Sequence, residues 1–239
     1  MLTQDELKQF SLQLYQPRKG YRYSLDAILL ARFCTEVQPS GSIVDLGAGC
    51  GIISLVLARI NPTSSVLAIE NNHEMAALVE RNIRHNDLAA RVSVHLEDII
   101  NYRTSHSGST FDLVVSNPPF RIPGKGKVSP FPGRDVARHE TTAGLIDFMT
   151  AAKYLVKPGG RINFIYHPSR LVEFIRCASE LKLGLLRLRM VHGTVGAEAK
   201  MFLAELAKGR RADVTVEAPL VVYGDDGEYT DEAARMLRG

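Results

Sequence analysis

The sequence holds few cysteines and no long apolar run, and each shortage excludes a class of protein. Cys34, Cys50 and Cys177 lie far apart and form no Cys-x-x-Cys pair, so we expect free thiols rather than disulfides or a zinc site. The histidines are not clustered at metal-ligand spacing, and we expect no metal. The apolar run at residues 27–34 is interrupted by Arg32 and is too short to cross a bilayer.

A secretory signal is also missing from the start of the sequence. The first eight residues contain two acids and no uninterrupted apolar segment, whereas a signal peptide needs a basic start and then an apolar stretch. We therefore expect a cytoplasmic protein with no membrane partner. Its 239 residues, 45% of them hydrophobic and 23% charged, suffice for one large globular domain with its own core.

Charge is nearly balanced overall but uneven along the chain. The 29 Lys and Arg residues exceed the 26 Asp and Glu residues by only 3, which does not by itself indicate a nucleic-acid partner. Residues 121–140 hold five basic and two acidic side chains, and residues 182–211 hold seven and two. Either stretch alone is explained by an ordinary solvated surface, and both are candidates for contact with nucleic acid.

Predicted strands and helices alternate along the first 170 residues. Short apolar runs bounded by turn residues predict strands at residues 42–46, 65–69, 92–96, 111–115 and 161–166. Periodic runs predict helices at residues 52–60, 74–85 and 145–156. Strands separated by helices indicate βαβ units, so we expect a doubly wound, mostly parallel α/β sheet that binds ligands at the carboxyl ends of its strands.

We expect one domain in three parts. Residues 1–40 are interpreted as a short helical preface and residues 41–183 as the core. Residues 184–239 are interpreted as C-terminal strands that end in a hairpin. Segments 185–191 and 201–206 bring the sheet to seven strands. No linker, repeat or low-complexity segment divides these parts.

A glycine-rich loop closes the first predicted strand. Asp45 is followed by Gly47, Gly49 and Gly51, and glycines at such positions let the backbone pass close to a ligand before a helix begins. A dinucleotide fold also uses a glycine loop, but its Gly-x-Gly-x-x-Gly spacing differs from the Gly-x-Gly-x-Gly of this chain. A pyrophosphate ligand is therefore the weaker interpretation.

Acids mark the ends of the next two predicted strands. Glu70 comes nineteen residues after Gly51, where a carboxylate accepts hydrogen bonds from both hydroxyls of a ribose. Asp98 would accept from an adenine amino group, with Ile99 packed on the ring. Each acid alone is explained equally well as a surface residue at a helix start. Together with the glycine loop they outline a nucleoside site.

These motifs together resemble those of the class I S-adenosylmethionine-dependent methyltransferases. Asp-x-Gly-x-Gly-x-Gly, the two strand-end acids and Asn-Pro-Pro-Phe at residues 117–120 occur in the order of that family. The last motif is typical of members that methylate a planar amino nitrogen. The resemblance covers at least residues 20–170. It implies a Rossmann-like fold, S-adenosyl-L-methionine as cofactor, and Asn71 beside Glu70 in the cofactor site.

A narrower resemblance points to the bacterial tRNA(Val) adenine-N6 methyltransferases. It is carried by residues 16–31, 137–140, 189–192 and 198–201. That family modifies adenosine 37 beside the anticodon, so the resemblance implies tRNA as the partner. It also places Ser24 and Asp26 at the methionine end of the cofactor, although a helix N-cap and a first-turn acid explain them equally well. His139 and Glu140 also suit the start of a helix.

The Asn-Pro-Pro-Phe turn has a chemical explanation. Pro118 and Pro119 cannot donate to a sheet ladder, so they end the fourth strand and stiffen the backbone after it. The lone pair of an adenine amine is delocalised into the ring. The Asn117 side chain and the Pro118 carbonyl would accept its two hydrogens and direct the nitrogen toward the methyl group. Phe120 would stack on the base, unless it is a core residue at a strand end.

The basic residues after this turn are the expected RNA contacts. They are Arg121, Lys125, Lys127, Arg134 and Arg138. Cationic side chains on a loop rich in glycine suit a segment that orders on phosphates.

Three other functions remain open from the sequence. A protein glutamine-N5 methyltransferase also presents a planar nitrogen to such a turn, but usually has Tyr in place of Phe120 and a larger helical domain in front. A guanine-N2 methyltransferase of ribosomal RNA often carries a duplicated domain, which this chain lacks. The last alternative is an RNA-binding module with an inactive cofactor pocket, and the intact motifs oppose it.

Overall fold

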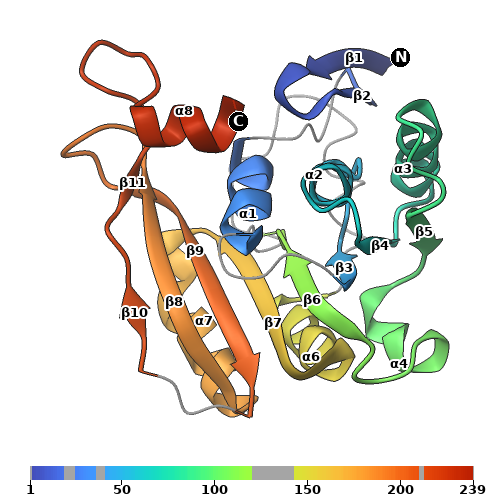
Figure 1. The fold of residues 1–239 in the computed structure, drawn as a ribbon. Helices are drawn as coiled ribbons and strands as arrows, with labels where there is room; N and C mark the ends of the chain where they lie inside the picture. Colours follow the sequence, from blue (N-terminus) through green and yellow to red (C-terminus); the bar gives the residue numbers. More distant parts are fainter. Residues whose placement is uncertain (1, 19–24, 36–40, 120–142, 210–212, 239) are drawn as a thin grey trace, which may run out of the picture.

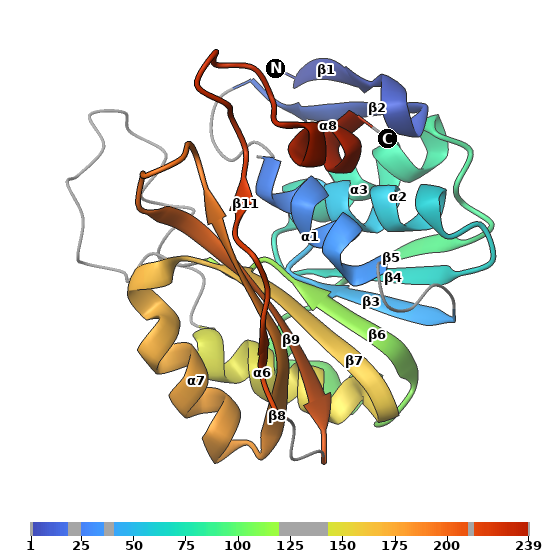
Figure 2. The same cartoon turned by 60° about the vertical axis from the view of Figure 1, so that its left-hand side comes forward.

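The computed structural model describes residues 2–18, 25–35, 41–119, 143–209 and 213–238, and it consists of one large sheet with helices on both faces and a small hairpin (Figures 1 and 2). The strands are β1 (Leu2–Leu7), β2 (Leu12–Pro17), β3 (Ser42–Leu46), β4 (Ser65–Glu70), β5 (Val92–Leu96), β6 (Phe111–Ser116), β7 (Val156–Tyr166), β8 (Leu183–His192), β9 (Ala199–Lys208), β10 (Thr215–Val216) and β11 (Leu220–Val221). The α-helices are α1 (Leu25–Thr35), α2 (Ile52–Ile60), α3 (His73–His85), α4 (Tyr102–Ser105), α6 (Leu145–Leu155), α7 (Leu171–Glu180) and α8 (Asp231–Arg238). Short 3-10 turns are η1 (Lys8–Phe10), η2 (Ile99–Asn101) and η3 (Pro168–Arg170). Among the described helices, none combines the length and the apolar composition that a bilayer crossing requires.

The large sheet is doubly wound and mostly parallel, as predicted. Its seven long strands have the order β8-β9-β7-β6-β3-β4-β5, and the two-residue strands β10 and β11 pair with β8. Neighbouring strands in the run β7-β6-β3-β4-β5 pair in parallel. β9 is antiparallel to both of its neighbours, β7 and β8. The chain therefore needs a helical crossover between most of its strands, which puts helices on both faces.

The winding direction of the sheet reverses at β3. The chain moves outward from β3 through β4 to β5, and then crosses back to β6 on the other side of β3. Such a reversal leaves a crevice beyond the carboxyl ends of the two central strands, where ligands bind in open α/β sheets. The ends of β3 and β6 are therefore the expected position of a site.

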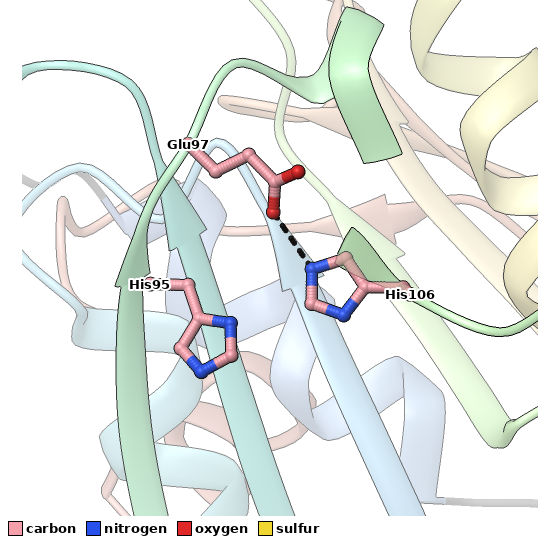
Figure 3. A group of neighbouring side chains, drawn as sticks. All are labelled: His95, Glu97 and His106. Carbon is pink, nitrogen blue, oxygen red and sulfur yellow. Dashed lines mark hydrogen bonds and ion pairs between the residues drawn. The ribbon is translucent and has the colours of Figure 1, made fainter. Parts of the chain in front are cut away.

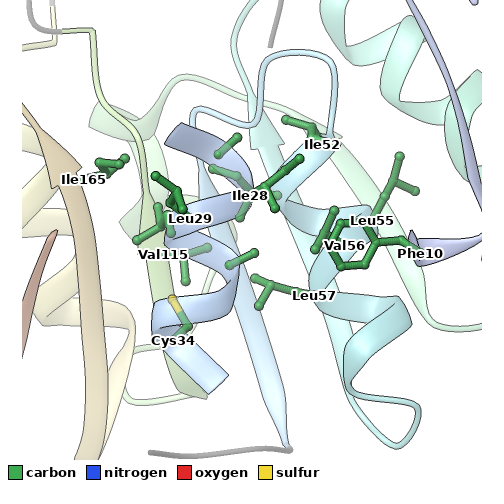
Figure 4. Close-up of a cluster of buried hydrophobic side chains, with 14 of the residues drawn as sticks. Phe10, Ile28, Leu29, Cys34, Ile52, Leu55, Val56, Leu57, Val115 and Ile165 are labelled. Carbon is green, nitrogen blue, oxygen red and sulfur yellow. The ribbon is translucent and has the colours of Figure 1, made fainter. Parts of the chain in front are cut away.

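Two apolar cores lie on opposite faces of the sheet. Helices α1, α2, α3 and α8 cover one face, and α6 and α7 cover the other (Figures 1 and 2). In the first core Ile28 and Leu29 of α1 pack near Val56 of α2 and Val115 of β6, all of them almost fully buried (Figure 4). Burial on both faces explains why the central strands appear in the sequence as continuous apolar runs.

The helical preface predicted for residues 1–40 is wrong over its first half. β1 and β2 form an antiparallel hairpin there, and α1 and η1 are the helical elements among the described residues of this segment. Alternate residues Leu12, Leu14 and Gln16 of β2 are at most 1% exposed. This two-residue period belongs to a strand with one buried face.

Asn82 of α3 and Asn86, the C-cap residue directly after α3, fix the hairpin to the core. The Asn82 side chain accepts a hydrogen bond from the Tyr15 amide at 2.8 Å and donates to the Tyr15 carbonyl at 2.9 Å. Asn86 does the same for Gln13, with both distances 2.8 Å. Because each asparagine satisfies both backbone groups of its partner, α3 acts toward β2 as a neighbouring strand would.

The C-terminal part combines predicted strands with one helix, α8, that was not predicted. β8 and β9 confirm two strands, and both are longer than expected. The segment predicted to be extended lies along β8 as β10 and β11, and an antiparallel bridge between Tyr223 and Tyr229 closes the predicted hairpin. Helix α7, which precedes this part, was not predicted from the sequence either. The first turn of α8 carries Asp231 and Glu232, acids that favour a helix N-terminus.

A buried ion cluster joins β7, β8 and β9. Glu205 of β9 is 2% exposed, and its two oxygens lie 3.2 Å from Arg161 Nε and 3.3 Å from Arg187 Nη2. Arg187 also pairs with Glu217 at 2.8 Å, and the neighbouring Arg189 pairs with Glu232. Two arginines of the second basic stretch are therefore used inside the protein.

Candidate active site

The carboxyl ends of the central strands meet at the reversal point of the sheet. β3 ends at Leu46 and β6 at Ser116, and these two residues are partners in the parallel ladder. The Ser116 hydroxyl donates a hydrogen bond of 2.7 Å to the Leu46 carbonyl. The residues that follow the two strands therefore begin side by side, although they are seventy positions apart in the chain.

The loop after β3 requires glycine for two reasons. Gly47, Gly49 and Gly51 have φ values of 74°, 58° and 84°, which side chains of L-residues rarely permit. A Cβ on Gly47 would also lie 3.1 Å from Phe148, and one on Gly51 would lie 3.0 Å from Val79. The loop thus keeps its backbone open to a neighbouring ligand while it packs closely against α3 and α6.

Glu70 holds this loop from the end of β4. Its Oε2 accepts a hydrogen bond of 2.7 Å from the Gly49 amide, and its Oε1 accepts one of 2.9 Å from the Asn72 amide. The residue is 7% exposed. Burial raises the pKa of the Glu70 carboxyl, and hydrogen bonds from the amides of Asn72, Gly49 and Asn71 oppose that rise. A carboxylate has about four acceptor sites, so Glu70 can still accept a hydrogen bond from a hydroxyl group of a ligand.

Asp45 is the most buried acid of the site. It is 0% exposed, and its Oδ2 accepts a hydrogen bond of 2.7 Å from the Ser54 hydroxyl. Its Oδ1 is buried and has no hydrogen-bond partner among the described residues. Burial raises the pKa of Asp45 to about 7, against the hydrogen bond from Ser54. A buried carboxylate with an unused oxygen favours a ligand that donates hydrogen bonds or carries positive charge.

Asp98 and Ile99 follow β5, further out on the same sheet edge. The Asp98 carboxylate accepts a hydrogen bond of 3.0 Å from the Ile100 amide and caps η2. Ile99 is 5% exposed and belongs to the core beneath α6, whereas Ile100 is 49% exposed. Contact of Ile99 with an adenine ring stays a prediction.

The Asn117 turn follows β6 directly. Asn117 is half-buried, Pro118 is buried and Pro119 is exposed. The Ser116 side chain is hydrogen-bonded to Leu46, the residue before the glycine loop. Asn117 is the next residue after Ser116, so the turn begins beside the start of that loop.

The structure describes two of the other predicted site residues, Asp26 and Asn71. Asp26 lies in the first turn of α1 and is half-buried, and Asn71 is exposed between β4 and α3. The remaining predicted residues lie outside the described residues; they are Ser24, Phe120, Arg121, Lys125, Lys127, Arg134 and Arg138.

Two residues of the site, Ser54 and Phe148, were not predicted from the sequence. Ser54 holds the inner oxygen of Asp45, and Phe148 packs against the glycine loop. A lone polar residue in the otherwise buried apolar part of α2 is a signal that could have indicated Ser54. Phe148 is one of several apolar residues on its helix face, and its sequence position gives no such signal.

A nucleoside-binding sheet edge with polar acceptors at the neighbouring strand end is the arrangement of a class I S-adenosylmethionine-dependent methyltransferase. Comparison with known families agrees. The family model described as "Methyltransferase small domain" matches residues 26–169, and the chain belongs to this family of methyltransferases.

Curated relatives and solved structures extend this result. A tRNA1(Val) (adenine(37)-N6)-methyltransferase of Porphyromonas gingivalis is 30% identical over 227 residues, which cover 90% of this chain and 86% of the relative. A protein of the same name from Vibrio campbellii is 25% identical, and the alignment covers 98% of this chain and 93% of that protein. The structure of a predicted O-methyltransferase from Agrobacterium tumefaciens superposes with a TM-score of 0.73 at 24% identity, covering 90% of this chain and 97% of that one. The last likeness confirms the fold.

The residues at this sheet edge fit S-adenosylmethionine, the cofactor of the class. Glu70 offers acceptor lone pairs for ribose hydroxyls, and Asp98 offers one carboxylate for an adenine amine. The unused oxygen of Asp45 suits the positive charge that the methionine part carries. The left-handed glycines allow the protein backbone to approach the cofactor closely.

Proposed function

We propose that the protein methylates the N6 amino group of adenosine 37 in tRNA(Val). The curated relatives from Porphyromonas gingivalis and Vibrio campbellii carry this activity in their names and align with 90% and 98% of this chain. The Asn-Pro-Pro-Phe motif supports the same chemistry independently. Its oxygen atoms can bind the hydrogens of a planar amine whose nitrogen receives the methyl group.

The observation that carries the proposal is the hydrogen bond between Ser116 and Leu46. It joins the end of the strand that bears the amide turn to the end of the strand that bears the cofactor loop. This hydrogen bond supports the proposal that the acceptors on Asn117 and Pro118 lie beside the cofactor. Proximity of this kind is a large part of the rate enhancement in bimolecular reactions.

Each group of the turn has a defined task in this proposal. The Asn117 side-chain oxygen and the Pro118 carbonyl accept the two hydrogens of the adenine amine and orient its lone pair. Pro118 and Pro119 restrict the backbone, so the acceptors keep their direction. When bound, S-adenosylmethionine supplies a methyl group on a positively charged sulfur. The Phe120 ring stacks on the adenine base after the base has flipped out of the RNA stack.

The basic residues between positions 121 and 138 are proposed as the tRNA contacts. The second basic stretch is a weaker candidate, because Arg187 and Arg189 are 13% and 8% exposed at their side chains and are paired with acids. This leaves Lys182 and Lys200 as exposed cations of that stretch among the described residues.

Transfer of a labelled methyl group to defined RNA tests the proposal. Purified protein is given a tRNA(Val) transcript and a matched transcript with guanosine at position 37, and the nucleosides are identified by mass spectrometry. We expect N6-methyladenosine in the first RNA alone. Label in protein would favour the glutamine reaction, and N2-methylguanosine would favour the guanine reaction. Binding of cofactor and RNA without any transfer would favour the binding module.

A further inference from the structure

A group of two histidines and one glutamate lies beside the outer edge of the sheet, away from the Asn117 turn. His95 is on β5, Glu97 follows that strand, and His106 follows α4 (Figure 3). One potential ligand atom from each of the three side chains lies within 4.8 Å of the others. Figure 3 shows both imidazole rings beside the Glu97 carboxylate.

The strand geometry explains why these side chains meet. Val92 and Val94 of β5 contact the core on the α3 side, so the alternate residue His95 lies on the other face. The Glu97 amide donates to the Glu70 carbonyl at 2.9 Å and continues the ladder by one residue. Glu97 therefore lies on the same face as His95.

His106 is held in place through its backbone. Its amide donates to the Tyr102 carbonyl at 3.0 Å, and its carbonyl accepts a hydrogen bond of 3.3 Å from the Tyr154 hydroxyl. The ring of His106 stacks with that of His95, with centroids 5.4 Å apart and an angle of 19° between the planes. The two imidazoles thus come from separate elements but share one orientation.

One oxygen of the buried Glu97 carboxylate lacks a hydrogen-bond partner among the described residues. Its side chain is 10% exposed and that of His106 is 8% exposed. One oxygen, Oε2, lies 2.7 Å from His106 Nε2. The other oxygen, Oε1, is buried without a hydrogen-bond partner among the described residues. A buried acceptor without a partner is destabilising, and the hydrogen bond between Oε2 and His106 does not satisfy Oε1.

We propose that His95, Glu97 and His106 form a binding site for a divalent transition-metal ion, with zinc as the expected occupant. Two imidazole nitrogens and one carboxylate oxygen are a donor set that zinc uses in proteins. The exposed side of His95 leaves the remaining coordination position to water. Calcium and magnesium prefer sets made of oxygen alone, so they are not expected to bind.

Zinc binding requires only a local adjustment. Ligands at about 2.0–2.1 Å from a tetrahedral zinc lie roughly 3.3 Å apart, so the His106–Glu97 contact lengthens while His95 approaches. The ion then links the edge strand β5 to the segment after α4. This proposal opposes the expectation from the sequence that no metal is bound. It is independent of the proposed tRNA activity.

Calorimetric titration of the untagged, chelator-treated chain with zinc tests the site. We expect one equivalent to bind, no comparable binding of magnesium, and a cobalt complex with the visible absorption of a low-coordinate ion. His95→Ala removes an exposed ligand without disturbing the core and should weaken zinc binding by at least about tenfold. His73→Ala, which removes an exposed histidine at the start of α3, is the matched control and should bind zinc as the unaltered chain does.

A second measurement covers the buried ligands, whose variants also affect folding. In the unaltered chain, zinc should shift the imidazole nuclear magnetic resonance signals of His95 and His106 and leave those of His73 unchanged. Glu97→Gln keeps the side-chain volume and should also weaken binding. Equal affinity in the His95→Ala and His73→Ala variants, or no binding at all, would overturn the proposal and leave the His106–Glu97 contact as a structural hydrogen bond.

Discussion

The Gly49 amide donates its hydrogen bond to the Glu70 carboxylate across the ends of β3 and β4. One side chain therefore holds the glycine loop and, in the proposed cofactor site, also accepts hydrogen bonds from the ribose. The two tasks are coupled, because we expect a change at Glu70 to alter the loop before any ligand binds.

Glu70→Gln is expected to weaken S-adenosylhomocysteine binding by about 1.5–3 kcal/mol, the value of a hydrogen bond to a charged group. The amide has one acceptor oxygen, so either the Gly49 or the Asn72 amide would face an NH₂ group. Calorimetry measures the affinity, and Glu74→Gln, an exposed acid in the first turn of α3, is the matched control. Equal affinity in both variants would show that Glu70 is not a ribose ligand.

Asn117→Ala is expected to lower the methyl-transfer rate by about 10²–10³, the usual loss on removing one oriented transition-state hydrogen bond. Cofactor affinity should change little, because no described contact joins Asn117 to the glycine loop directly. Single-turnover transfer and calorimetry with S-adenosylhomocysteine measure the two quantities separately. Full activity would contradict the role given to the amide.

Asp45 makes the stability of the ligand-free protein depend on pH. Its folded-state pKa is about 7, above the ordinary value of 3.8, so the folded state binds the proton more tightly than the unfolded state. Stability from this group is fully present below about pH 4 and is lost as the pH rises through 7. Asp45→Asn lacks this proton but can still accept the bond from Ser54.

Urea unfolding at pH 5 and pH 8 measures this difference. The free energy of unfolding should fall with rising pH more steeply in the unaltered chain than in Asp45→Asn, by roughly 3 kcal/mol, at about 1.4 kcal/mol for each pKa unit in this interval. Identical pH dependence of the two proteins would show that Asp45 is already ionised throughout.

Gly51→Ala and Gly159→Ala separate backbone strain from packing. The two glycines have φ values of 84° and 82°, so both variants should lose about 1–2 kcal/mol of stability to strain. A Cβ at Gly51 lies 3.0 Å from Val79, whereas a Cβ at Gly159 meets nothing within 4 Å. Gly51→Ala should therefore lose more stability and weaken cofactor binding as well. Denaturant unfolding compares them, and an equal loss would show that α3 moves aside.

Neutralising Lys125, Lys127 and Arg134 together should flatten the salt dependence of tRNA binding. Each phosphate contact contributes roughly 0.7–0.9 to the slope of log K against log salt, so three contacts contribute about 2–3. Cofactor affinity should not change. The comparison is a variant in which the exposed Lys182 and Lys200 are neutralised. An unchanged slope in the first variant and a flatter one in the second would move the RNA contacts to the C-terminal stretch.

The parallel core of the fold could be predicted closely from the sequence. β3 and β5 have the predicted bounds, and β4 and β6 are each one residue longer. Strands buried on both faces consist of apolar residues throughout, and glycine, proline and asparagine mark their ends. Asp45, the three glycines and Glu70 follow from the same signals, because Asp45 and Glu70 lie at or beside the ends of β3 and β4 and the glycines lie in the loop after β3.

The N-terminal hairpin could not be predicted in the same way, because its partner is distant in the chain. Asn82 and Asn86 contact Tyr15 and Gln13 over separations of 67 and 73 residues, and an acidic start resembles a helix N-terminus. The three residues of the proposed metal site are a similar case. Their approach depends on the turn that follows α4, and sequence spacing does not show it.

Glu205 lies between Arg161 of β7 and Arg187 of β8, and this arrangement constrains how the protein can evolve. Removing one member of a buried ion group leaves an uncompensated charge, which costs about 3–5 kcal/mol, whereas replacing the whole group by apolar residues is often neutral. Single substitutions at these positions are therefore expected to destabilise the protein. Related chains should either keep all three residues or exchange them together for an apolar set, and because Arg187 also pairs with Glu217, that exchange should include Glu217. The antiparallel edge of the sheet should then be inherited as a unit.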